Sequence, residues 1–150
     1  MNRYSYIISS LFLLLYSCHL PADPSEPLPA DPAKMTANYR LIKKLMPLLQ
    51  SGDMIFRNGN DEVSRAARQF NRKDTSYSHC GLLFIENDTA FVYHALGGSY
   101  NPSQELMRQP LDSFCNPAEN NAVAVYRYPL NPAQQEKLRQ IVNAFYRSGL

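Results

Sequence analysis

Two histidines in neighbouring predicted strands are the residues of this chain best suited to chemistry. His79 lies in the segment 78–83 and His94 in the segment 92–95. The polar turn 86–89 between them, flanked by apolar and β-branched residues, predicts a hairpin. The start of the first strand then lies beside the end of the second, so both rings are expected at one edge of the sheet. One imidazole can accept a proton while the other orients it, as base and orienter of a nucleophilic catalytic site.

Three helices are predicted around this hairpin by apolar residues that recur at a helical period. The first covers residues 35–49, where Pro47 ends or bends it, and the second covers residues 62–70. The second has an apolar face, formed by Val63, Ala66, Ala67 and Phe70. The third helix is the clearest, and Gly149 ends it. Its start is marked by an N-cap, a proline and a capping-box amide, which are Asn131, Pro132 and Gln134.

Short strands complete the expected architecture. They cover residues 54–56, after the turn 51–53, and residues 122–128. Asp53 is expected to open its strand as a turn residue rather than to neighbour the site. Residues 106–114 predict either a short helix or an irregular segment. The order of elements favours an α+β fold, in which an antiparallel sheet is covered mainly on one face by packing helices.

The segment 1–17 predicts a signal peptide. Arg3 supplies a positive charge, and residues 6–16 form an apolar run too short to span a bilayer. Residues 15–18 resemble the lipobox of bacterial lipoproteins, which implies cleavage before Cys18 and lipidation of its sulfur. The protein is then expected in the cell envelope, lipid-anchored to a bacterial membrane and facing the periplasm or the surface. A plain secretory signal with an incidental cysteine is the alternative.

Residues 18–33 predict a proline-rich tether between this anchor and one folded domain over residues 34–150. The chain has 15 Lys and Arg against 13 Asp and Glu, so its charge gives no reason to expect nucleic acid as a partner. A solvated helix surface accounts for the local basic group Arg65, Arg68, Arg72 and Lys73.

Three segments resemble the circularly permuted papain-like hydrolases of the YiiX type. These are relatives of the NlpC-like peptidoglycan peptidases and of lecithin retinol acyltransferase. The segments are residues 52–56, 77–82 and 93–95. The resemblance covers roughly residues 50–128 and implies a permuted papain-like fold, with His79 as catalytic base and His94 as the residue that orients it. Cys80 departs from the family pattern, in which this position is aliphatic.

A convincing nucleophile for such a site is missing from the sequence. Cys80 follows His79 in one strand, so the two side chains point to opposite faces, and Cys80 is expected to pack as a buried thiol. Cys115 lies in a predicted loop with no helix N-terminus to lower its pKa, and it could instead pair with Cys80. In the family the cysteine follows a later helix. We therefore expect either a piece of a longer enzyme or a non-catalytic remnant. A truncated domain should expose apolar surface and be marginally stable.

Two functions follow from these expectations. The first is a membrane-anchored cysteine hydrolase of amidase or peptidase type, without cofactor, that acts on peptidoglycan peptides or related acyl substrates through a thioester. The alternative is a non-catalytic surface lipoprotein that binds muropeptide or lipid in the same cleft. A metal hydrolase is disfavoured, because His19 lies in the tether and no further residue has zinc-like spacing to His79 and His94.

Overall fold

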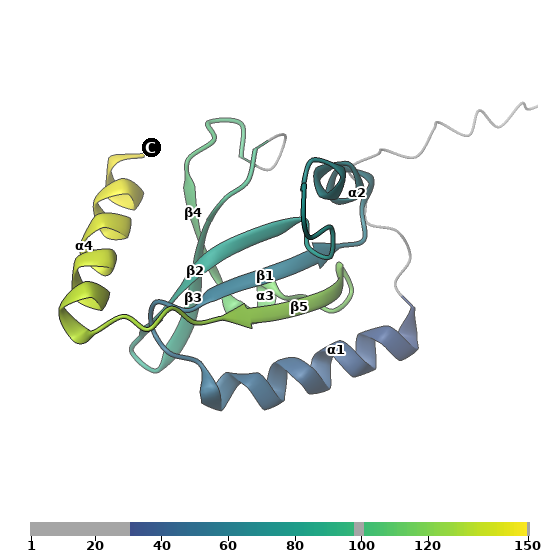
Figure 1. The fold of residues 1–150 in the computed structure, drawn as a ribbon, viewed down its shortest axis with the longest axis horizontal. Helices are drawn as coiled ribbons and strands as arrows, with labels where there is room; N and C mark the ends of the chain where they lie inside the picture. The colour runs from purple at the N-terminus through teal and green to yellow at the C-terminus, as the bar shows by residue number, and fades with distance from the viewer. Residues whose placement is uncertain (1–30, 98–100, 150) are drawn as a thin grey trace, which may run out of the picture.

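The computed structural model describes residues 31–97 and 101–149, which form an α+β fold built on a five-stranded antiparallel sheet (Figure 1). The fold class is the one predicted from the sequence. The predicted signal peptide, Cys18 and most of the tether lie outside the described residues. The elements in chain order are α1 (Pro32–Leu45), η1 (Met46–Leu48), β1 (Met54–Gly59), α2 (Glu62–Gln69), β2 (His79–Glu86), β3 (Thr89–Ala95), β4 (Leu106–Pro110), α3 (Leu111–Phe114), β5 (Asn120–Tyr126) and α4 (Pro132–Ser148).

The strands follow the order β4-β3-β2-β1-β5, and each neighbouring pair is antiparallel. The predicted hairpin is present as β2 and β3. Its turn residues Asn87 and Asp88 both have positive φ, 47° and 63°, as the two-residue turns that match strand twist require. The register pairs Leu82 with Tyr93. Continuing this register by one residue places Gly81 opposite His94.

The ends of the helices explain where the sequence predicted well and where it did not. α4 has the predicted capping box at Asn131 and ends at Gly149, whose φ of 69° is left-handed. α1 begins at Pro32, inside the segment predicted as tether, because Asp31 caps it and accepts a hydrogen bond from the Ala33 N–H at 2.9 Å. A proline in the first turn has no N–H to satisfy, so it starts a helix readily.

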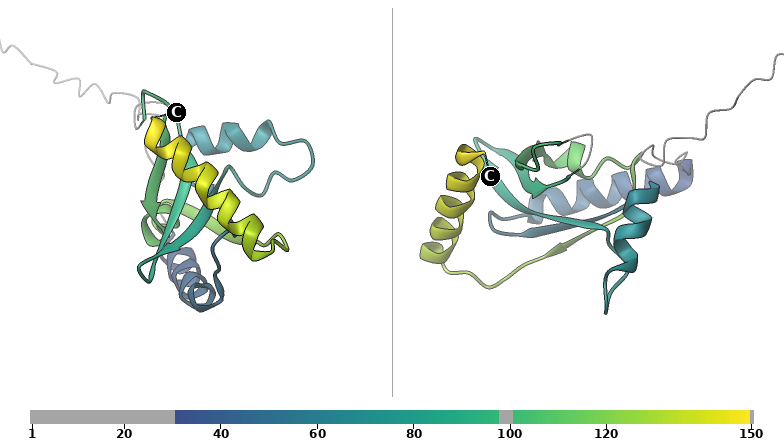
Figure 2. Two further views of the ribbon diagram at one scale, coloured as in Figure 1. Left: turned by 90° about the vertical axis from the view of Figure 1, so that its left-hand side faces the viewer. Right: turned by 90° about the horizontal axis from the view of Figure 1, so that it is seen from above.

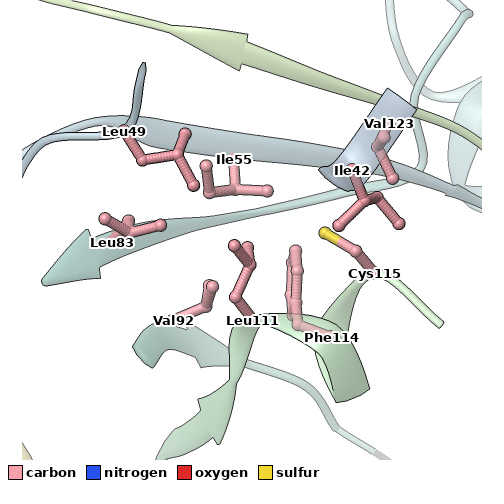
Figure 3. Packing of buried hydrophobic residues seen from close by; sticks show 9 residues of the cluster. All are labelled: Ile42, Leu49, Ile55, Leu83, Val92, Leu111, Phe114, Cys115 and Val123. Atoms are coloured by element: carbon pink, nitrogen blue, oxygen red, sulfur yellow. The ribbon is translucent and has the colours of Figure 1, made fainter. Parts of the chain in front are cut away.

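Helices pack on both faces of the sheet, so the expected covering of mainly one face holds only in that the larger core cluster lies on one face. The reason is visible in β2, where the consecutive residues Leu83 and Phe84 point to opposite faces and are both buried. Leu83 belongs to the larger core cluster, under α1, η1 and α3, whereas Phe84 packs with Val142 of α4. The larger cluster is shown in Figure 3 and consists of Ile42, Leu49, Ile55, Leu83, Val92, Leu111, Phe114, Cys115 and Val123.

The segment that the sequence left open, residues 106–114, forms the edge strand β4 followed by the one-turn helix α3. β4 pairs with β3, so that Gln109 lies opposite Val92 and Met107 opposite His94. α3 then places Leu111 and Phe114 in the core. None of the helices in residues 31–97 and 101–149 is long and apolar enough to cross a bilayer.

Asp53 ties the start of β1 to the segment that follows β5. Its side chain is only 1% exposed, and it binds Arg127 with both oxygens, each at 2.7 Å. It also accepts the Gln50 N–H at 2.8 Å, while Arg127 donates to the Leu48 carbonyl oxygen at 2.6 Å. Asp53 is therefore a structural residue at the opening of its strand, as the sequence predicts.

Replacing Asp53 with Ala should lower the free energy of unfolding by about 2 kcal/mol, because the Gln50 N–H and the Arg127 guanidinium lose their hydrogen bonds to a charged acceptor. The urea-unfolding midpoint measures this. Glu62→Ala is a matched control, since it removes an ion pair with Arg65 whose side chains are both more than 40% exposed. That change should cost less than about 1 kcal/mol. Equal midpoints for the two variants would contradict the structural role of Asp53.

Candidate active site

The two imidazoles lie in direct contact, as predicted. The Nε2 atom of His79 is 3.0 Å from the Nδ1 atom of His94, and the ring planes are nearly perpendicular at 88°. The strand register explains this contact, because Gly81 lies opposite His94 and His79 is two residues before Gly81 on the same face. The site therefore depends on the pairing of β2 with β3.

Gly81 makes room for this contact. A Cβ atom at this position would lie 2.4 Å from Val92 Cγ1, 2.9 Å from the Tyr93 carbonyl oxygen and 3.0 Å from His94 Cβ. Side chains of the neighbouring strand therefore fill the space beside Gly81, which leaves no room there for a substrate or another helix.

Gln109 is a third member of the site, and it fixes where the protons lie. Its Oε1 atom is 3.1 Å from Nε2 of His94. With the Gln109 amide in this orientation its oxygen accepts, which places the His94 proton on Nε2 and leaves Nδ1 of His94 as an acceptor. The Nε2–H of His79 is then the donor in the contact between the rings. Neutral His79 consequently keeps an unshared lone pair on Nδ1, which is the atom that can act as a base.

Gln109 was not among the site residues predicted from the sequence. It lies in the segment 106–114, for which no strand was predicted, and it reaches His94 only through the pairing of β4 with β3. A glutamine in a short edge strand carries no local signal of such a role.

Phe114 and Arg57 enclose the two rings. Phe114 is fully buried, and its ring centroid lies 4.9 Å from that of His94 and 5.7 Å from that of His79. Arg57, which pairs with His79 in the sheet, lies over the Phe114 ring at 4.6 Å and donates to the Phe114 carbonyl oxygen at 3.1 Å. The rings are therefore held in a largely apolar environment with one cation nearby.

This environment keeps both histidines neutral. Burial, and after it the positive charge of Arg57, lowers the pKa of His79 to about 4, and His94 adds to the effect. The same two causes lower the pKa of His94 to about 4, although its hydrogen bond to Gln109 acts in the opposite direction. At neutral pH both rings are unprotonated, and Nδ1 of His79 is available to accept a proton.

Neither described cysteine is placed to act with this base. Cys115 is 2% exposed, and burial raises the pKa of its thiol to about 12. Cys80 lies on the face opposite to the His79 ring, and partial burial also raises its pKa. Both thiols are free, so they form no disulfide with each other. Cys80 is exposed rather than buried as expected.

A cleft of about 480 Å³ is lined in part by His79 but not by His94, and its lining residues Phe56 and Cys80 lie on the sheet face opposite to the His79 ring. It is lined by Phe56, Asn71, Arg72, Lys73, Asp74, Tyr77, Ser78, His79 and Cys80. Tyr77 flanks this cleft, with its ring centroid 5.7 Å from that of Phe56. Tyr93 does not line this cleft, because its hydroxyl donates to Glu86 at 2.7 Å on the face that α4 covers.

Comparison of the chain with protein-family models and with curated proteins found no match. The case for a site at His79 and His94 therefore depends on the contacts described above. These contacts support a proton acceptor held by two further polar groups, and the catalytic roles remain a proposal.

Gly81→Ala should disrupt the histidine pair, because the added methyl group would collide with Val92 and His94. Overpacking of this kind typically costs about 1–3 kcal/mol, so the free energy of unfolding measured with urea should fall by about 2 kcal/mol. Gly97→Ala is the control, since a Cβ there comes no closer than 4.0 Å to another residue. If both variants unfold at the same urea concentration, close packing over Gly81 is not required.

Stability should also depend on pH through the two rings. Their folded-state pKa values of about 4 lie below the ordinary value of 6.5, so the unfolded chain binds more protons between these limits. The free energy of unfolding should therefore fall as the pH drops from about 6.5 to 4, by about 3 kcal/mol for one ring. Urea unfolding over this pH range measures the change in the free energy of unfolding. His79→Gln should weaken its dependence on pH. A slope equal to that of the parent chain would contradict the lowered pKa of His79.

Proposed function

We propose that this chain carries the base and the orienting groups of a cell-envelope cysteine hydrolase with a permuted papain-like fold. Its substrates would be amide or ester bonds in peptidoglycan peptides or related acyl compounds. The observation that supports this most is the hydrogen-bonded series from Gln109 through His94 to His79, with Nδ1 of His79 left free. The predicted lipidation of Cys18 would hold the domain at a bacterial membrane.

The proposed reaction begins when Nδ1 of His79 takes the proton of a thiol. The thiolate attacks the substrate carbonyl carbon, the bond to the leaving amine breaks, and His79 returns the proton to that amine. Water then attacks the thioester while His79 takes its proton, and the thiol is released. The bond from Nε2–H of His79 to His94 keeps Nδ1 directed at the reacting atom throughout.

The low pKa of His79 follows from burial and from its neighbours among the described residues. Without a nearby anion, burial and Arg57 disfavour the imidazolium. A thiolate placed beside the ring would favour the charged form, because opposite charges within a few ångströms stabilise each other. The thiol has to come from a group other than Cys80 and Cys115, whose pKa values are raised and whose side chains point away from His79 or lie in the core.

A second candidate function is binding of muropeptide or lipid without turnover. It is favoured by the cleft beside His79 and by the absence of a suitably placed thiol among the described residues. The two candidates differ in one measurable respect, which is the release of product.

The experiment incubates the 150-residue chain with muropeptides and a small exogenous thiol, and follows cleavage by mass spectrometry. We expect cleavage that requires His79 and is lost in His79→Gln, while His19→Gln retains it. At a fixed thiol concentration and at pH values well below the pKa of the thiol, the rate should rise through about pH 4, the pKa of His79, and level off above it. Binding without cleavage would favour the second function, and neither binding nor cleavage would contradict both.

A further inference from the structure

α2 presents an uncovered apolar face. Val63, Ala66 and Phe70 follow the spacing i, i+3 and i+7, which places them on one side of the helix and its C-cap. All three are exposed, with Val63 at 58% and Phe70 at 85%. The apolar face predicted from the sequence is real, but most of it points to solvent.

Polar contacts on the other side of α2 hold the helix in this orientation. Asp61 accepts the Ser64 N–H and hydroxyl, each at 2.7 Å. Arg68 reaches back to β1, where it donates to the Asn58 side chain and to the Gly59 carbonyl oxygen. An eight-residue helix is marginal by itself, so these bonds to β1 help to fix it. The outward direction of Phe70 is therefore set by the fold.

Basic residues adjoin this face. Arg72 and Lys73 come directly after it, are exposed, and form no ion pair within the described part of the chain. The nearby acidic groups are engaged locally: Glu62 pairs with Arg65 at 2.8 Å, and Asp74 accepts the Ser76 N–H at 2.8 Å. The apolar face thus lies beside two cations that form no ion pair with a described residue.

α2 lies at the opposite end of the sheet from α4, and the loop after it projects from the body of the molecule (Figures 1 and 2). We propose that Val63, Ala66, Phe70, Arg72 and Lys73 form a membrane-contact surface that binds anionic lipid. Phe70 would enter the boundary between headgroups and acyl chains, while the two cations meet lipid phosphates.

The shape and charge of this surface favour a lipid bilayer over a protein partner. A projecting aromatic side chain with adjacent cations suits a soft anionic surface, whereas a protein partner usually needs a larger complementary area. The loop with Arg72 and Lys73 also lines the cleft beside His79. Contact with a membrane would therefore hold that cleft near the level of the lipid headgroups. The proposal does not require the chain to be catalytic.

Tryptophan fluorescence tests this surface in the full chain, which contains no tryptophan of its own. Phe70→Trp places a single reporter in the proposed surface. Phe145→Trp is the matched control, since Phe145 is a 52% exposed phenylalanine on α4. With phosphatidylglycerol-containing vesicles, we expect a blue shift and quenching by brominated lipids for Phe70→Trp, and neither change for Phe145→Trp.

The charge requirement is tested by adding Arg72→Gln and Lys73→Gln to the Phe70→Trp chain. The blue shift should be lost, and it should also weaken in high salt or with vesicles of phosphatidylcholine alone. A solvent-exposed emission spectrum for Phe70→Trp on vesicles that sediment with the protein would overturn the proposal, because the chain would then bind through another segment. An equal response of Phe145→Trp would overturn it as well.

Discussion

The pairing of β2 with β3 in one register is the constraint on which the site depends. Side chains alternate along a strand, so a shift of the register by one residue would turn His94 to the other face and separate it from His79. The same pairing requires Gly81, because Val92 and His94 occupy the space where a larger side chain would stand. The hairpin, its turn at Asn87 and Asp88, and the packing of α3 onto the sheet all serve to hold this alignment.

Burial explains the chemistry of both the histidines and the core cysteine. A low-dielectric environment disfavours whichever form is charged, so it lowers the pKa of an imidazole and raises that of a thiol. His79 and His94 are therefore neutral, with pKa values near 4, and Cys115 keeps its proton, with a pKa near 12. The burial that keeps His79 neutral therefore also keeps the Cys115 thiol protonated and unreactive. This contrast is why the proposed reaction needs a thiol from elsewhere.

The parts of the fold with strong local signals could be predicted from the sequence. The capping box at Asn131 and the polar turn between the hairpin strands are determined by neighbouring residues, and they led to α4 and to the pairing of His79 with His94. Gln109 could not be predicted, because it becomes part of the site only through the pairing of an edge strand. The exposure of Cys80 could not be predicted either, because it depends on where helices pack on the sheet. Short segments of sequence do not determine that packing.

The central claim is that His79 is neutral, protonated on Nε2, and free at Nδ1. Nitrogen-15 NMR of the imidazole rings reports both the tautomer and the pKa of each histidine, with His19 assigned by substitution. The account predicts the Nε2–H tautomer for His79 and His94 at pH 7, with no protonation until the pH approaches 4. An Nδ1–H tautomer of His79, or titration of His79 near the ordinary value of 6.5, would contradict it.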